Sequence, residues 1–226
     1  MTPTSEPTVS AVPTRLAVPA VGWCEDGRAD PITGLLAFPD FHLVFPLEMA
    51  AALRAGALVG VAIGDVDNLK DYVENSNVAD TELFGHLAGN AVMTRLGDVA
   101  RAWFWEQEIV RGCVSTFGGD EIIVALHAQS RGAFVAAVAE LRARLNVELP
   151  RTVSFALTTL SMDEPPFLPG DDGRGGGYNA VYLRTMRTLD CHLFERKAAH
   201  RRNGRLIDSF LAVVDVSARP GNGARR

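Results

Sequence analysis

Three acidic residues, Asp65, Asp120 and Glu121, come where the pattern of side chains predicts the ends of two β-strands. Asp65 closes a long apolar run, and Asp120 and Glu121 stand in a turn that begins with the glycines at 118–119. Carboxylates that meet at one sheet edge raise one another's pKa, and an oxygen-ligand cation such as Mg²⁺ relieves the repulsion. The pattern favours a divalent-cation site; the alternative is a Gly-Gly-Asp turn with exposed acids.

Lysine is rare in this chain. Of the 22 basic residues only Lys70 and Lys197 are lysine. A compact ammonium on a long stem reaches a phosphate oxygen in a way that the planar guanidinium of arginine does not reproduce. The two lysines are therefore candidate phosphate ligands, and drift in composition is the alternative explanation.

The elements that must position these residues follow from apolar periodicity. We expect helices at 38–54, 80–105, 130–146 and 178–201. We expect strands at 57–66, 108–116, 121–127 and 152–160, of which the second and third form a hairpin. The core order β-α-β-β-α-β predicts an α+β fold of the ferredoxin-like or palm type, with an antiparallel sheet and added helices. In that topology the strand that ends at Asp65 lies beside the hairpin.

The length of 226 residues suits one domain with tails. Proline, serine and threonine dominate the start, so we expect a flexible leader at 1–22, a folded domain at 23–212 and a flexible tail at 213–226. Met162–Gly177 and the polar segment 71–77 are predicted to be loops.

Composition excludes several classes of protein. The hydrophobic share of 47% is that of a globular protein, and the longest apolar runs are too short to span a membrane. The three cysteines are far apart, which favours a reducing, cytoplasmic location. The net charge of -5 argues against a nucleic-acid binder, although a local basic cluster at 196–205 could meet a small anion.

Four separated segments occur in a characteristic order: Asp30-Pro31-Ile32-Thr33-Gly34-Leu35 with Phe41, Asp65-Val66-Asp67-Asn68-Leu69-Lys70, Phe117-Gly118-Gly119-Asp120-Glu121-Ile122, and Asp190 with Phe194, Lys197 and Arg201. With these segments the sequence resembles GGDEF domains, the catalytic modules of diguanylate cyclases, over about residues 30–205. Both lysines fall on positions that bind phosphate in that family.

The resemblance implies a function in bacterial second-messenger signalling. It implies that two domains, each holding one nucleoside triphosphate with Mg²⁺ or Mn²⁺, face one another as a homodimer. Each 3′-hydroxyl then attacks the partner's α-phosphate, so GTP gives cyclic di-GMP and pyrophosphate. Because the chain shows no sensor segment, dimerisation would use the domain itself, its tails or a regulatory protein partner.

The resemblance also implies roles for single residues. Asp65, the carbonyl of Val66 and Asp120 would bind the metal. Glu121 would join them or help to deprotonate the attacking hydroxyl. Asp65, Asp120 and Glu121 are thus the candidate catalytic residues.

A second group of residues is implied to hold the nucleotide. Lys70, Lys197 and Arg201 would neutralise the triphosphate, and backbone amides near Asn68 and Leu69 would cradle its end.

The chain departs from the family around the base. Asn90 stands where the family uses an aspartate to bind guanine. The segment 71–85 is longer than the corresponding segment of the family, and it puts Val73 where the family has an asparagine that contacts the base. An amide accepts at one end and donates at the other, so Asn90 matches adenine better than guanine. GTP is the expected substrate and ATP is a possible one.

Two functions from different classes remain open on this sequence. One is an active nucleotidyl cyclase, because Asp65, Asp120, Glu121 and both lysines are retained. The other is a degenerate domain that binds a nucleotide or dinucleotide and regulates a partner without catalysis, as Asn90 and the insertion suggest.

Overall fold

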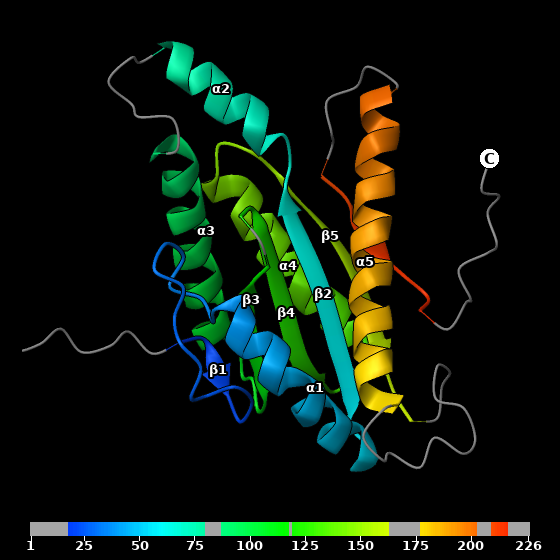
Figure 1. The fold of residues 1–226 in the computed structure, drawn as a ribbon. Helices are drawn as coiled ribbons and strands as arrows, with labels where there is room; N and C mark the ends of the chain where they lie inside the picture. Colours follow the sequence, from blue (N-terminus) through cyan, green and yellow to red (C-terminus); the bar gives the residue numbers. More distant parts are fainter. Residues whose placement is uncertain (1–17, 80–86, 118, 163–176, 203–208, 217–226) are drawn as a thin grey trace, which may run out of the picture.

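The computed structural model describes residues 18–79, 87–117, 119–162, 177–202 and 209–216. Its strands form one sheet in the order β1-β3-β4-β2-β5-β6 (Figure 1). They are β1 Ala20–Val21, β2 Leu58–Val66, β3 Gly112–Thr116, β4 Glu121–Ala128, β5 Val153–Leu160 and β6 Leu211–Val213. The helices are α1 Phe38–Arg54, α2 Leu69–Ala79, α3 Leu87–Glu106, α4 Arg131–Glu148 and α5 Gly177–Arg202.

Strand β2 lies at the centre of the sheet and determines its register. It pairs antiparallel with β4 on one side and with β5 on the other, so Asp65 lies opposite Glu121 and opposite Ser154. Its interior residues are buried on both faces, as its nearly continuous apolar sequence predicts. This pairing confirms that the strand of Asp65 lies beside the hairpin β3–β4.

Helices cover both faces of the sheet. The crossover helices α3 and α4 pack on one face around Ala62 and Val66, and the added helices α1 and α5 pack on the other around Val61 and Ile63 (Figure 1). Alternate residues of β2 thus point into two separate cores. The fold is the predicted α+β arrangement, with a central antiparallel sheet of four strands extended by β1 and β6.

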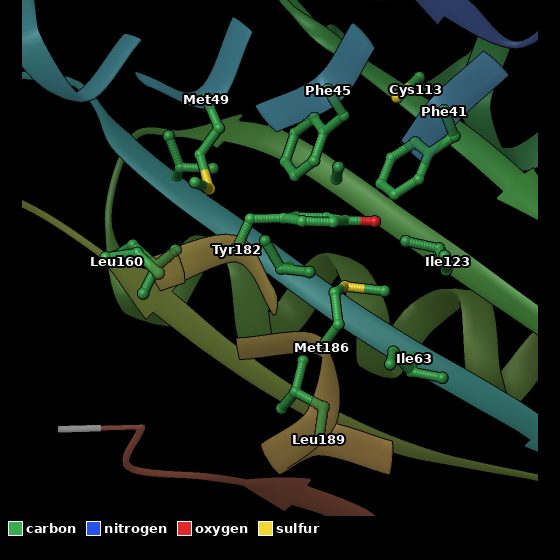
Figure 2. Packing of buried hydrophobic residues seen from close by; sticks show 14 of the residues in the cluster. Phe41, Phe45, Met49, Ile63, Cys113, Ile123, Leu160, Tyr182, Met186 and Leu189 are labelled. Carbon is green, nitrogen blue, oxygen red and sulfur yellow. The ribbon is translucent and has the colours of Figure 1, made fainter. Parts of the chain in front are cut away.

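The core between α1 and α5 is aromatic. Figure 2 shows Tyr182 of α5 lying against Phe41, Phe45 and Met49 of α1. The Tyr182 hydroxyl lies 3.1 Å from Nδ1 of His42, so the one polar end of this ring has a partner. This packing fixes α5 across the sheet and brings its C-terminal half to the end of β2.

The segment Asp30–Leu35, first of the four motifs, has a structural role. The Asp30 carboxylate accepts hydrogen bonds from the backbone N–H and the hydroxyl of Thr33, at 2.8 and 2.9 Å. The turn so formed lies against α3 at Gly97, where a Cβ would be only 1.9 Å from the carbonyl oxygen of Thr33. Only glycine lets the turn and the helix approach this closely.

The prediction of a loop at 71–77 was wrong, because these residues lie in α2. Leu69, Tyr72 and Val73 have the i, i+3, i+4 spacing of a helix face, and the first two pack against the α3–α4 core. The guanidinium of Arg151 lies 5.5 Å from the centre of the Tyr72 ring. Polar residues fill the rest of the helix and conceal this short periodicity.

The folded domain extends beyond the predicted limits at both ends. Strand β1 lies within the expected leader 1–22 and pairs with β3, while Val214 and Val216 are buried within the expected tail 213–226. A two-residue strand is too short to give a periodic signal. Residues 1–17 and 217–226, and nearly all of the predicted loop Met162–Gly177, lie outside the described residues. Among the described helices, none combines the length and apolar character that crossing a bilayer requires.

Candidate active site

Two acidic side chains share one face of the sheet at the end of β2. Asp65 and Glu121 are directly opposite in the antiparallel register, and opposite residues point to the same side. Asp120 precedes β4, and its carbonyl accepts a hydrogen bond from the N–H of Val66 at 3.2 Å. The backbone therefore ties the turn that carries Asp120 to the end of the strand that carries Asp65.

Lys197 reaches this acidic group from α5. Its ammonium nitrogen Nζ lies 2.7 Å from Oδ1 of Asp65, 2.9 Å from the Asp65 carbonyl oxygen and 2.9 Å from Oδ1 of Asp67. The side chain is buried, with the residue only 4% exposed. A buried ammonium needs such partners, because leaving a charge unpaired in the protein interior is costly.

Asp67 lies deeper than Asp65 and is bound by residues at the start of β5. The hydroxyls of Thr152, directly before β5, and of Ser154 donate to its Oδ2 at 2.8 and 2.9 Å, and its N–H donates to the Thr152 carbonyl at 2.8 Å. Asp67 follows directly after β2, and its carboxylate and that of Asp65 both meet Lys197.

The electrostatics of this group are unfavourable for a full set of ionised carboxylates. Burial, together with the nearby charges of Asp65, Asp190 and Asp120, raises the pKa of Glu121 to about 8 against the opposing effect of Lys197. Burial likewise raises the pKa of Asp65 to about 6, although Lys197 lowers it. One ammonium does not neutralise four neighbouring acids, so the site favours the arrival of further positive charge.

A cavity of about 240 Å³ opens over these residues. It lies where β2 leads into α2 and beside the C-terminal half of α5. These parts of the chain are in the upper half of Figure 1. The residues predicted from sequence that line it are Asp65, Val66, Asn68, Leu69, Lys70, Asp120, Glu121, Lys197 and Arg201. The structure thus brings together nine of the ten residues singled out above.

The chain between β2 and α2 suits an anion. Asn68 has a positive φ of 55°, a backbone conformation that asparagine tolerates better than most residues, and α2 begins directly after it. The free N–H groups of a helix start carry partial positive charge. Lys70 in this first turn is exposed and lies 3.8 Å from Glu74, a weak pairing that leaves its charge accessible.

The donors present fit a hard cation such as Mg²⁺ or Mn²⁺. They are carboxylate and carbonyl oxygens, and two of the carboxyl groups have raised pKa values that a cation would lower. Within the described part of the chain, no three His, Cys, Asp or Glu side chains are already arranged as a metal cluster. Proteins usually hold Mg²⁺ through one or two carboxylates together with substrate phosphates and water.

Asn90, the tenth predicted residue, does not line the cavity. It lies exposed near the start of α3. Its neighbour Gly89 faces α2, where a Cβ would lie 3.3 Å from the Cγ2 atom of Val73. Val73 and Gly89 therefore lie side by side where α2 faces α3, and neither lines the cavity.

Sequence reasoning missed five residues as parts of the site. Asp71 of α2 and Asp190, Leu193 and Phe194 of α5 line the cavity, and Asp67 binds Lys197. The signal for Asp67 was its place two residues after Asp65, directly beyond the end of the predicted strand. The signal for Asp190 was its place seven residues, or two helical turns, before Lys197.

Comparison with solved structures finds GGDEF domains. One is a microbial GGDEF domain described with cyclic di-GMP, at 23% identity and a TM-score of 0.52, where the match covers 82% of this chain and 96% of that one. Another is the coiled coil and GGDEF domain of DgcB from Caulobacter crescentus in complex with c-di-GMP, at 16% identity and a TM-score of 0.57, covering 82% and 85%.

A third similar structure is the diguanylate cyclase SiaD from Pseudomonas aeruginosa in complex with its activator SiaC, at 19% identity and a TM-score of 0.57. The match covers 82% of this chain and 61% of SiaD, so the chain spans about three fifths of that protein. No family model and no curated protein matches the sequence. The resemblance is therefore confirmed at the level of the fold: the chain has a GGDEF-like fold.

Proposed function

We propose that this protein is a nucleotidyltransferase, dependent on Mg²⁺ or Mn²⁺, that condenses two nucleoside triphosphates into a cyclic dinucleotide such as cyclic di-GMP. The observation that supports it best is the cavity in which Asp65, Asp120 and Glu121 face the cations Lys197 and Arg201. Phosphoryl transfer depends mainly on positioning and on stabilisation of charge, and these two kinds of side chain supply both.

The reaction is a displacement at phosphorus. The 3′-hydroxyl oxygen of one nucleotide bonds to the α-phosphorus of the other, the bond from that phosphorus to the β-phosphate oxygen breaks, and pyrophosphate leaves. A second, equivalent attack closes the ring. A bound divalent cation would stabilise the negative charge that develops on the phosphates.

The residues of this chain would divide the remaining tasks. Glu121, with its pKa raised to about 8, suits transfer of the hydroxyl proton near neutral pH if it does not bind the cation itself. Lys197 and Arg201 would hold phosphate oxygens. Asp65 and the Val66 carbonyl would orient the cation, and the N–H groups at the start of α2 would face the end of the triphosphate.

Each cavity would hold one triphosphate, so turnover requires two copies of the chain that face one another. SiaD is described in complex with an activator protein. We propose that a protein partner or self-association likewise brings two copies of this chain together.

Base selectivity is expected to be relaxed. Val73 offers no hydrogen bond, and Asn90 is an amide in place of a carboxylate, so a guanine bound between α2 and α3 would lose part of its pairing. A mismatch of this kind costs about 1 to 3 kcal/mol. Formation of cyclic di-GMP alone from a mixture of GTP and ATP, read by product mass, would refute the relaxed selectivity.

The experiment that tests the proposed function measures product from purified protein with Mg²⁺ or Mn²⁺ and GTP, ATP or both. We expect a cyclic dinucleotide and pyrophosphate from the wild type and none from Asp120→Ala. Glu195→Ala, which removes an exposed acid of α5 outside the cavity, is the matched control and should retain turnover.

The second candidate function is binding without catalysis. It is favoured by the direct pairing of Lys197 with Asp65, because the site partly balances its own charge without a metal. A binding domain would give no product, yet it would bind a nucleotide or dinucleotide, and Asp120→Ala would weaken only the metal-linked part of that affinity. Calorimetric titration in parallel with the product assay distinguishes the two functions.

A further inference from the structure

We propose that Asp67 is a positioning residue that keeps Lys197 in the wall of the cavity, so that Asp65 can exchange the lysine for a ligand cation. The inference rests on the proposed function in one respect, namely that the cavity binds a divalent cation with a triphosphate. It assigns different tasks to the two carboxylates that hold the same ammonium.

Asp67 is held rigidly by the protein. The residue is 1% exposed, and two hydroxyls, those of Thr152 directly before β5 and of Ser154 within it, donate to its Oδ2 atom. Its backbone N–H is also bonded to Thr152. With one carboxylate oxygen and the main chain fixed, the side chain has little freedom to rotate or to reach the cavity.

The second oxygen of Asp67 is directed at Lys197. Oδ1 lies 2.9 Å from the ammonium nitrogen, in an ion pair whose alignment falls short of a hydrogen bond, and it accepts no hydrogen bond from the described residues. Lys197 is therefore its one charged partner there. A buried carboxylate of this kind holds its counter-ion strongly, because neither charge can turn to water.

Asp65 is held much less firmly. Its side chain is 23% exposed and borders the cavity, and its carboxylate forms an ion pair with Lys197. The Lys197 ammonium also donates a hydrogen bond to the main-chain carbonyl oxygen of Asp65 at 2.9 Å, and this bond does not depend on the carboxylate. If the Asp65 carboxylate turned towards a cation, the Lys197 ammonium would keep its ion pair with Asp67 and its hydrogen bond to the Asp65 carbonyl oxygen.

The consequence is a specific dependence of cation binding on Asp67. Without the charge of Asp67, the ion pair that Lys197 keeps among the described residues is the one with Asp65, and an incoming cation must compete with the ammonium for that carboxylate. Binding of a metal-free triphosphate does not require Asp65 to be released. Loss of Asp67 should therefore weaken the cation and spare the triphosphate.

The test compares Asp67→Asn with wild type in two titrations. The first measures Mn²⁺ by electron paramagnetic resonance at a fixed, saturating concentration of a non-hydrolysable triphosphate, and the second measures the same triphosphate in EDTA by calorimetry. We expect Mn²⁺ affinity to fall about tenfold or more, in the range seen for residues that support metal ligands, while metal-free affinity stays within about threefold.

Thr152→Val is the milder variant. It removes one hydroxyl bond to Asp67 and keeps the shape of the side chain, so it should weaken Mn²⁺ in the same direction and by a smaller factor. Thr158→Val, a change of the same type farther along β5, is the matched control and should leave both affinities unchanged. Melting temperatures identify any variant that is not folded. If Asp67→Asn is not folded, the Mn²⁺ and triphosphate affinities of Thr152→Val decide whether the inference holds.

A purely structural role for Asp67 would lower both affinities equally or neither of them, and either result overturns the inference. If wild-type protein binds neither Mn²⁺ nor the triphosphate, the proposed function fails together with it. The two failures are thus distinguishable.

Discussion

Replacing Glu121 by glutamine should stabilise this protein at alkaline pH. Burial and the charges of Asp65, Asp190 and Asp120 raise the pKa of Glu121 from 4.5 to about 8. The folded protein therefore binds more protons than the unfolded chain between these values, and stability falls as pH rises through that window. Glutamine has the same shape and does not ionise, so the variant lacks this loss.

The size of the effect follows from the shift. A difference of about 3.5 pH units at 1.36 kcal/mol each gives about 5 kcal/mol as an upper limit. Glu121 is partly exposed, and solvent screens its charge, so we expect less than half of this, about 2 kcal/mol above pH 8. For a domain of this size that corresponds to an increase in Tm of about 4 to 8 °C.

The assay is urea denaturation and thermal melting of both proteins from pH 5 to pH 9 without metal or nucleotide. The stability difference should be small at pH 5, grow towards pH 8 and then level off. Glu195→Gln, which changes an exposed acid of α5, should give no such trend. A Glu121→Gln variant that is no more stable than wild type at pH 9 would refute this description of the site.

Three further changes test how the site is supported. Lys197→Met leaves Asp67 buried without its cation and should cost about 3 kcal/mol in urea denaturation; a loss below about 1 kcal/mol would contradict the buried ion pair. Gly97→Ala forces a Cβ against the backbone of Thr33 and should lower the free energy of unfolding by about 2 kcal/mol, and an unchanged value would mean that the turn yields easily. Ser130→Ala removes the bond that caps α4 and should cost about 1 kcal/mol, with Ser130→Asp restoring most of it.

The arrangement of the sheet could be predicted because β2 carries strong, local signals. Its apolar run identified a strand buried on both faces, and the glycines before Asp120 identified the hairpin that pairs with it. Since opposite residues in antiparallel strands share a face, the meeting of Asp65 with Glu121 followed from the topology. The resemblance to GGDEF domains supplied the same order of elements.

Other features depend on contacts between distant segments and could not be predicted in this way. Helix α2 is largely polar and is held by a short apolar edge that meets α3 and Arg151. The charged partner of Asp67 comes from α5, and its hydroxyl donors come from the start of β5 and the residue before it, so the sequence near Asp67 gives no indication of them. Asn90 was expected in the nucleotide site on resemblance alone, and the structure places it outside the acidic cavity.

The most direct test of the central claim is the anomalous scattering of Mn²⁺ in crystals grown with a non-hydrolysable nucleoside triphosphate. We expect one Mn²⁺ bound to the carboxylate of Asp65 and to oxygen from Asp120 or Glu121, with the phosphates against Lys197 and Arg201. A triphosphate bound elsewhere, or a Mn²⁺ held without Asp65, would contradict the assignment of this cavity as the site of nucleotidyl transfer.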